Sequence, residues 1–268
     1  MRTQQRHADY YDALPRWGTE PDEANRERIQ QTLSLVPVNV RSILDLGCGD
    51  GTVSNHLVDE GSSVVGVDIS FEALRYFKGK GIIGSLEQLP FKDNSFDLVI
   101  CAEVLEYLLV AAYEFAKQQI ERVAQDYVIV STPNQEELHA GFGRCANCKI
   151  IFHTALHLRA FDRKAHQTLF RGFDCLKTIE IEKWKRLTNI YWLEHSLLGV
   201  YRAKEGRICP HCGHRQPAPK LGIAKRIVLK GFRMVGELFP PPEKAHWIAS
   251  LYKKRNLSNV GEVARQFS

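Results

Sequence analysis

Short runs of hydrophobic residues alternate with segments of helical spacing through the first half of the chain. Each run ends at glycine, proline or a polar turn, which is typical of strands buried on both faces. Five strands are predicted in this way, at residues 42–46, 62–70, 81–85, 96–104 and 126–133. Strands that alternate with helices predict a parallel sheet with right-handed crossovers.

The pattern differs on either side of this region. Residues 1–40 are polar with helical spacing and end near Pro37. After residue 134 there is no clear core periodicity until a short helix predicted over 162–171. Two further alternating segments, 175–184 and 246–255, predict the last two strands. These strands bracket a long insertion.

The composition is that of a globular protein. Of the 268 residues, 44% are hydrophobic and 25% are charged, which excludes a disordered or low-complexity chain. The first twenty residues contain no apolar segment, and no apolar run approaches the roughly 20 residues that span a bilayer. We therefore expect a cytoplasmic protein without a secretory signal. Seven cysteines then favour metal sites over disulfides.

Charge is divided unevenly along the chain. Residues 1–134 carry 12 Lys and Arg against 20 Asp and Glu, whereas residues 135–268 carry 24 against 11. The first half is therefore acidic and the second half basic. We expect the two halves to face different partners.

A glycine-rich loop follows the first predicted strand. Gly47, Gly49 and Gly51 stand where that strand turns into a helix, and glycine there allows a tight turn and a close approach of a ligand to the backbone. The fingerprint of a nicotinamide site, G-x-G-x-x-G, is not met because Thr52 occupies the third glycine position.

Two carboxylates accompany this loop. Asp45 stands two residues before the first glycine, where it suits a ligand with an ammonium group and repels a pyrophosphate. Asp68 ends the second predicted strand, where it can accept both hydroxyls of a ribose. The electrostatics therefore favour S-adenosylmethionine (SAM) over a nicotinamide dinucleotide.

Four linked motifs resemble the class I SAM-dependent methyltransferases of the UbiE-like methyltransferase domain group. They are ILDLGCGDGTVS, VVGVDIS, SLEQLPFKDNSFDLVICAEVLEYL and YVIVSTPN, within residues 40–134. The resemblance implies an α/β fold with a Rossmann-like seven-stranded sheet, mostly parallel with the last strand antiparallel. Insertions would follow strand 5 and separate strands 6 and 7. The cofactor would lie across the C-terminal ends of the first strands.

This resemblance also implies a division of the chain. The expected parts are an N-terminal helical segment (1–40), a SAM-binding core (41–134), an insertion with the first cysteine pair (135–160), a helix and strand 6 (161–184), a basic insertion with the second cysteine pair (185–244), and strand 7 with the tail (245–268).

The resemblance further implies the cofactor contacts. It places the loop glycines beside the methionine moiety, Asp45 on its amino group and Asp68 on the ribose. Family members often hold the adenine with an aspartate at the position of Ser85, so the adenine contact stays open among Ser85, Leu86 and Glu87. The full expected set is Asp45, Gly47, Cys48, Gly49, Gly51, Asp68, Ile69, Ser85, Leu86, Glu87, Cys101 and Ala102.

Two histidines follow the fifth strand. His157, in HTALHLRAF, resembles a recurring His-x-Arg-x-Phe stretch of the family that faces the acceptor pocket. His153 lies four residues earlier, on the same face if this piece is helical. Either histidine is a candidate general base for a hydroxyl acceptor. The alternatives are a structural histidine or a metal ligand.

Two Cys-x-x-Cys pairs, Cys145 with Cys148 and Cys209 with Cys212, can each offer two thiolates to one tetrahedral Zn²⁺. Sixty residues separate the pairs, which is long for a zinc ribbon. Because one pair follows strand 5 and the other lies between strands 6 and 7, both can emerge at the same end of the sheet. We predict a structural four-cysteine zinc site. The competing site combines Cys145 and Cys148 with the two histidines.

The basic half offers two further hypotheses. Residues 220–239 predict a basic amphipathic helix, which either lies on an anionic membrane surface or packs on the sheet. Trp184, Tyr191 and Trp192 lie among basic residues and can stack nucleobases.

The sequence thus predicts a SAM-dependent methyltransferase. Its expected acceptor is a small molecule or a lipid- or glycan-linked group, with an anionic acceptor suggested by the basic half and O-methylation weakly favoured. An RNA methyltransferase that grips the nucleic acid with the zinc module and the basic half is the alternative. A non-catalytic, zinc-stabilised binding module is the second alternative. Nothing in the sequence indicates an oligomeric state.

Overall fold

The computed structural model describes residues 8–14, 17–184, 205–218, 222–223, 227–228, 230–231 and 243–255, without the side chains of 183 and 184. Most of the predicted basic helix at 220–239 lies outside these residues. Tyr191, Trp192 and the side chain of Trp184 lie outside them too, so the stacking hypothesis concerns undescribed side chains.

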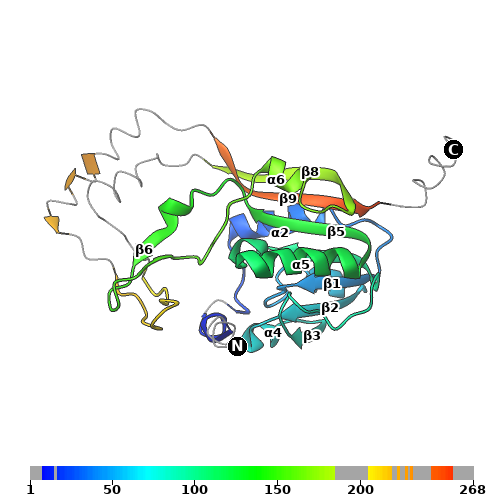
Figure 1. The fold of residues 1–268 in the computed structure, drawn as a ribbon, viewed down its shortest axis with the longest axis horizontal. Helices are drawn as coiled ribbons and strands as arrows, with labels where there is room; N and C mark the ends of the chain where they lie inside the picture. Colours follow the sequence, from blue (N-terminus) through cyan, green and yellow to red (C-terminus); the bar gives the residue numbers. More distant parts are fainter. Residues whose placement is uncertain are drawn as a thin grey trace.

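A seven-stranded sheet forms the centre of the molecule (Figure 1). Its strands are β1 (Ser42–Leu46), β2 (Ser63–Asp68), β3 (Lys80–Ile83), β4 (Phe96–Ala102), β5 (Ala124–Pro133), β8 (Phe173–Trp184) and β9 (Lys244–Lys254). Their order is β3-β2-β1-β4-β5-β9-β8. β9 runs antiparallel to both of its neighbours, β5 and β8, and the other adjacent strands are parallel. The predicted fold, with an antiparallel last strand, is confirmed.

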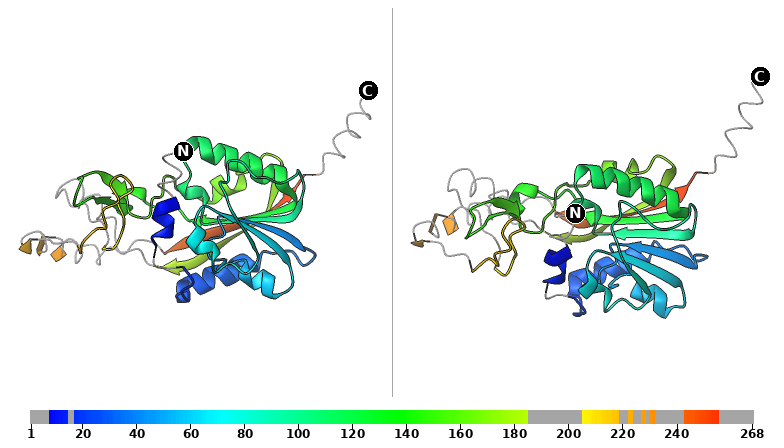
Figure 2. Two further views of the ribbon diagram at one scale, coloured as in Figure 1. Left: turned by 90° about the horizontal axis from the view of Figure 1, so that it is seen from below. Right: turned by 60° about the horizontal axis from the view of Figure 1, so that its bottom comes forward.

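Helices cover both faces of this sheet (Figure 2). α2 (Glu23–Leu33) and α3 (Asn55–Asp59) lie on one face, and α5 (Val110–Val123) and α6 (Arg163–Gln167) lie on the other. Successive side chains of a strand point to opposite faces. In β4, Leu98 and Ile100 therefore pack toward α2 and α3, whereas Val99 packs toward α5. Burial on both faces explains why the central strands are continuous hydrophobic runs.

α6 is shorter than the helix predicted over 162–171, and two other helices are also short. α3 has only five residues, α4 (Phe71–Leu74) has four and α6 has five. The N-terminal segment is not one helix to residue 37: residues 8–12 are helical, and α2 begins anew after Asp22, whose side chain accepts a hydrogen bond from the N–H of Asn25. Gly18 and Pro21 lie between the two helices, and both residue types interrupt helical spacing.

The segment after β5 forms a small unit of its own. It contains the 3₁₀ turn η2 (Leu138–Gly141) and an antiparallel hairpin of β6 (Phe142–Arg144) and β7 (Ile151–His153). The expected shared helical face of His153 and His157 is wrong, because His153 ends a strand and His157 lies in the irregular segment after it. We call residues 135–160 together with 205–218 the cap. In Figure 1 the cap projects from the side of the sheet.

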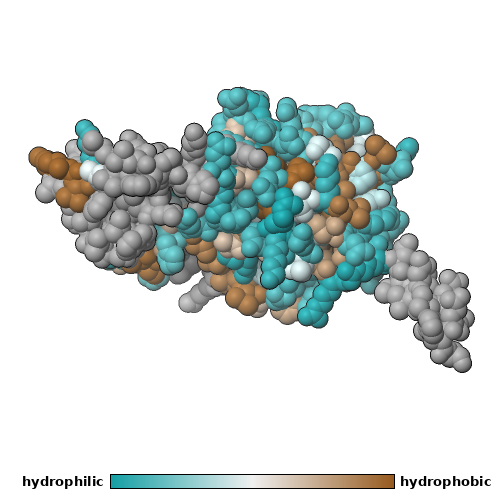
Figure 3. All heavy atoms as spheres, turned by 90° about the horizontal axis from the view of Figure 1, so that it is seen from above, coloured by the Kyte–Doolittle hydropathy of each residue, from teal (hydrophilic) through white to brown (hydrophobic). Residues whose placement is uncertain are grey.

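The surface over α6, β8 and β9 is mainly hydrophilic, with hydrophobic residues scattered over it (Figure 3). In the part of the chain that the structure describes, no helix has the length and apolar character needed to cross a membrane.

Candidate functional site

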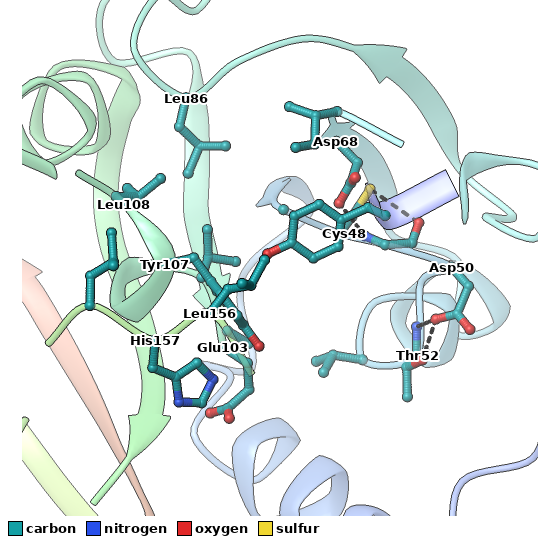
Figure 4. Close-up of a pocket in the computed structure, with 18 of the residues that line it drawn as sticks. Cys48, Asp50, Thr52, Asp68, Leu86, Glu103, Tyr107, Leu108, Leu156 and His157 are labelled. Atoms are coloured by element: carbon teal, nitrogen blue, oxygen red, sulfur yellow. Dashed lines mark hydrogen bonds between the residues drawn. The ribbon is translucent and has the colours of Figure 1, made fainter. Parts of the chain in front are cut away.

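A cavity of about 920 Å³ opens where β1, β2 and β4 end. Ligands of open α/β sheets bind at this carboxyl edge. Pockets for small molecules and cofactors usually have about 300–1,000 Å³, so this cavity lies at the upper end of that range. Its lining includes all the residues expected to contact SAM except Gly51 and Cys101. Figure 4 shows Asp68 and Cys48 on one side of the cavity and His157 and Glu103 on another.

The glycine loop has the backbone that only glycine adopts easily. Gly47, Gly49 and Gly51 have φ values of +70°, +55° and +79°. A methyl group on Gly47 would overlap the side chain of Val104, and one on Gly51 would overlap Asn55. Gly51 therefore closes the turn against α3 and does not line the cavity.

Asp68 is held by the loop. Its Oδ2 accepts a hydrogen bond from the N–H of Gly49 at 2.8 Å, and its Oδ1 accepts one from the N–H of Ser70, also at 2.8 Å. Each carboxylate oxygen can accept a second hydrogen bond. The carboxylate thus stands fixed at the end of β2, in the wall of the cavity.

Asp45 lies in the wall of the cavity with only 3% of its surface exposed. Burial, together with the charge of Asp68, raises the pKa of Asp45 to about 7. A buried carboxylate in this state gains from a cation beside it. Asp45 is therefore suited to a positively charged ligand group.

The cysteines of the core are inert by environment. Cys101 has no exposed surface and packs in the core on the α5 side. Cys48 lines the cavity, and burial raises the pKa of its thiol above the usual range. A thiol in an apolar environment is a poor nucleophile.

Arg28 of α2 also lines the cavity, and the sequence analysis did not single it out. It is 9% exposed, and its Nε and Nη2 donate to Oδ1 of Asn25 at 3.3 Å. The guanidinium lies 5.7 Å from the ring of Trp247. No carboxylate among the described residues contacts it directly, although its charge favours the ionised forms of Asp22 and Glu106 and so acts to lower the pKa of each. Buried charges are normally paired, so this guanidinium is suited to an anionic ligand group.

Glu103 follows β4 and has a φ of +58°, which is uncommon for a residue other than glycine. Its Oε1 accepts from the hydroxyl of Ser131 at 2.8 Å, and its Oε2 accepts from Nε1 of Trp247 at 3.0 Å. These bonds fix the carboxylate in the cavity wall. Strained backbone of this kind occurs often at functional sites.

At the cap end of the cavity, His153 and His157 lie beside Glu136. Nδ1 of His157 is 2.5 Å from Oε2 of Glu136, and Nε2 of His153 is 3.6 Å from Oε1. The two imidazole rings stack with centroids 5.1 Å apart. Both rings line the cavity, so the structure brings the two predicted histidines together with a carboxylate that the sequence analysis missed.

The four cysteines of the two Cys-x-x-Cys pairs meet in the cap. Their sulfur atoms all lie within 4.8 Å of one another. Sγ of Cys145 is 3.7 Å from Sγ of Cys212, and Sγ of Cys148 is 3.7 Å from Sγ of Cys209. A tetrahedron with Zn–S bonds of about 2.3 Å has edges of about 3.8 Å, whereas a disulfide needs about 2.05 Å. The arrangement can therefore hold one tetrahedral metal ion.

Hydrogen-bond donors surround these sulfurs. Nε2 of Gln216 lies 3.4 Å from Sγ of Cys145. Burial opposes ionisation of Cys145, but this bond and the backbone N–H groups of Cys148 and Asn147 lower its pKa to about 6. The competing set of Cys145 and Cys148 with two histidines is wrong, because the histidines form a separate group with Glu136.

Part of this chain matches a known protein family. Residues 44–129 match a family model described as a methyltransferase domain. The core of this chain is a class I SAM-dependent methyltransferase domain. Solved structures agree at the level of the fold: a SAM-dependent methyltransferase from Archaeoglobus fulgidus has a TM-score of 0.52 at 16% identity, covering 85% of this chain and 91% of that one.

These curated relatives each match less than half of this chain. An uncharacterised protein of Methanocaldococcus jannaschii is 36% identical over 124 residues, which are 45% of this chain and 52% of the relative. A ubiquinone biosynthesis O-methyltransferase of Albidiferax ferrireducens is 28% identical, covering 32% and 38%. A bovine 18S rRNA (guanine-N(7))-methyltransferase is 42% identical over 72 residues, covering 25% and 26%. The chain spans about half or less of these relatives.

The cap lies outside the residues that match the methyltransferase domain model. Its hairpin nevertheless reaches the cavity, because Phe152 and Leu156 pack with Cys145 and Cys209 and also line the cavity beside Pro210. The cysteine cluster is thus in direct contact with the cap wall of the methyltransferase domain's cavity.

Proposed function

We propose that the chain acts in the cytoplasm and transfers a methyl group from SAM to a small-molecule or lipid- or glycan-linked acceptor, with oxygen as the favoured acceptor atom. One observation carries the proposal: a single cavity joins the carboxyl edge of the methyltransferase sheet to the histidines of the cap. Such a cavity can hold a methyl donor at one end and an acceptor at the other.

The donor end supports SAM through complementary groups. Asp68 would accept the ribose hydroxyls, and Asp45 would face the ammonium group of the methionine moiety. Arg28 is the buried cation in the same wall, and it would pair with the carboxylate of that moiety. The adenine would lie between Ile69 and Leu86, near Ser85 and Glu87.

SAM supplies a methyl group already activated on a sulfonium. The chain's task is therefore mainly to align the acceptor, and alignment alone can supply most of the acceleration. A hydroxyl acceptor must also lose a proton. His157, in the cap wall of the cavity, would receive that proton as general base, and His153 would support it.

Zinc is proposed as a structural cofactor. The four cysteine sulfurs have the spacing of a tetrahedral site and are met by N–H donors. Bound Zn²⁺ would tie residues 145–148 to residues 209–212 and so fix the hairpin that forms the cap wall. The ion would not touch the acceptor.

RNA is the alternative acceptor. A bovine rRNA methyltransferase is among the relatives of this chain, and residues 135–268 are strongly basic. RNA binding through these residues would weaken steeply with salt. The hypothesis that residues 220–239 contact a membrane remains a separate prediction.

The proposal is tested by calorimetric titration with SAM, followed by transfer of labelled methyl groups from SAM into fractionated cell extract. We expect SAM to bind, and label to appear in the lipid, glycan or small-molecule fraction. Label confined to RNA would support the alternative acceptor. A wild-type chain that does not bind SAM would leave only the non-catalytic binding module.

A further inference from the structure

The hydrogen bonds among His153, His157 and Glu136 fix which ring nitrogens carry protons. The backbone N–H of His157 donates to Nδ1 of His153 at 3.1 Å. In a neutral imidazole one nitrogen donates and the other accepts, so the proton of His153 lies on Nε2. That nitrogen faces Oε1 of Glu136 at 3.6 Å.

This assignment separates the group from a metal site. A histidine that binds a metal through Nε2 normally carries its proton on Nδ1 and donates a hydrogen bond from it. Nδ1 of His153 instead accepts a hydrogen bond from the N–H of His157, so metal binding through Nε2 would require a ring without any proton. The hydrogen bonds therefore favour proton transfer over metal binding at this group.

The same reasoning shows which ring nitrogen of His157 carries the proton. Oε2 of Glu136 lies 2.5 Å from Nδ1 of His157, and a carboxylate only accepts, so Nδ1 carries the proton. Nε2 then has a free lone pair. Nε2 has no hydrogen bond to any residue that the structure describes, and the ring lines the cavity. The imidazole of His157 and the ring of Tyr107 make a T-shaped contact, with centroids 4.8 Å apart.

We propose that Glu136 is a positioning residue that holds His157 as a base directed at the methyl acceptor, while Nε2 of His153 faces the other oxygen of its carboxylate. This inference rests on the proposed function. Glu136 itself does not line the cavity, so it acts through the histidine. Gly141 leaves room for the ring of His153, because a methyl group at residue 141 would overlap that ring.

The reaction balances with these groups alone. The acceptor oxygen forms a bond to the methyl carbon while the carbon–sulfur bond breaks. The electron pair of the carbon–sulfur bond stays on sulfur, which becomes a neutral thioether. The hydroxyl proton passes to Nε2 of His157. The imidazolium that results lies against the carboxylate of Glu136, which stabilises its charge.

Long-range ¹H–¹⁵N spectra of the histidine rings test the arrangement without any acceptor. At a pH where both rings are neutral, we expect His157 protonated on Nδ1 and His153 protonated on Nε2. Glu136→Ala should return His157 to a mixture dominated by the Nε2–H form, while Glu137→Gln, the neighbouring carboxylate, should leave the spectrum unchanged. A wild-type His157 protonated on Nε2 would overturn the proposal.

Kinetics give the second readout, with label transfer into the reactive extract fraction as the assay. Glu136→Gln, which keeps the shape of the side chain, should lower turnover at least tenfold while the Kd for SAM stays within about twofold. Unchanged turnover would overturn the inference. So would a second equivalent of metal that survives Cys145→Ser and disappears with Glu136→Gln. Failure of the wild type to bind SAM would instead overturn the proposed function, and the ring spectra would remain a separate result.

Discussion

The N–H of Gly49 donates a 2.8 Å hydrogen bond to Oδ2 of Asp68. This bond ties the loop after β1 to the end of β2, and both parts line the cavity. The loop and the proposed ribose-binding carboxylate therefore form one unit. A change in Asp68 should disturb the loop as well as the ligand.

Asp68→Asn should weaken SAM binding at least tenfold. The variant keeps the size of the side chain but replaces one acceptor oxygen by a donor, which faces either the N–H of Gly49 or that of Ser70. An unpaired buried donor costs about 1–3 kcal/mol. Calorimetric titration with SAM measures the loss of affinity.

Asp97→Asn is the matched control for this change. The Asp97 carboxylate also accepts two backbone N–H groups, from Arg41 and Ser42, but it does not line the cavity. The Asp97→Asn variant should have a lower melting temperature and the same affinity for SAM as the wild type. Equal losses of affinity in both variants would show that Asp68 has only a structural role.

Arg28→Met should weaken binding of SAM by about tenfold or more. Methionine preserves the apolar stem that packs in the cavity wall but removes the guanidinium. If Arg28 pairs with the methionine carboxylate, the variant should bind 5′-methylthioadenosine, which lacks that carboxylate, as well as the wild type does. Arg26→Met on the exposed side of α2 is the control. Equal losses for both ligands would place Arg28 elsewhere in the site.

The sequence predicted the sheet well because its central strands are buried on both faces. Ile43, Leu44 and Leu46 belong to two different cores, so β1 has to be hydrophobic at nearly every position. Helix ends were predicted less well. Short helices such as α3 are stabilised by packing on the sheet, and helical spacing in the sequence does not show where that packing ends.

The donor side of the site could also be predicted, because its glycines and carboxylates lie in one motif. Arg28 and Glu136 could not. Arg28 lies on a polar helix with the sequence pattern of a surface helix. Its burial depends on distant residues such as Trp247, which packs near its guanidinium in the folded chain. Glu136 lies in an irregular segment, and its partners depend on the path of the cap. The one available signal was its place shortly after the carboxyl end of β5.

Cys145→Ser should remove most of the bound zinc. A purified chain prepared without chelator is expected to contain about one equivalent of zinc, and the variant less than half, because serine is a poor ligand for a tetrahedral thiolate site. Cys175→Ser, which changes a cysteine outside the cluster, should keep the metal. Metal analysis measures both. Equal zinc in the two variants would contradict the four-cysteine site.

Gly47→Ala should destabilise the fold and abolish SAM binding. The left-handed backbone costs a non-glycine residue about 1–2 kcal/mol, and the added methyl group would also overlap Val104. Gly61→Ala separates these effects, since Gly61 has a φ of +91° but open space around it. It should lose stability and retain SAM binding. Chemical unfolding and calorimetric titration measure the two quantities. Full SAM binding by Gly47→Ala would contradict the close approach of the ligand to this loop.

Binding of SAM should release a proton from Asp45. Burial raises the pKa of Asp45 to about 7, so the group is largely protonated at pH 6 in the free chain. The cationic ligand favours the ionised form and lowers this pKa, so binding at pH 6 should release nearly one proton. The Kd should rise by up to tenfold per pH unit as the pH falls below 7.

The folding free energy follows the opposite trend. Since the folded pKa of Asp45 lies above its usual value of 3.8, its contribution to stability is complete below about pH 4 and is lost as the pH rises through 7.

Calorimetric titration with SAM in buffers of different ionisation enthalpy counts the protons that are released on binding. Asp45→Asn should bind SAM without the release at pH 6. A wild-type chain that releases no more protons than this variant would show that Asp45 is already ionised or does not meet the ligand's charge.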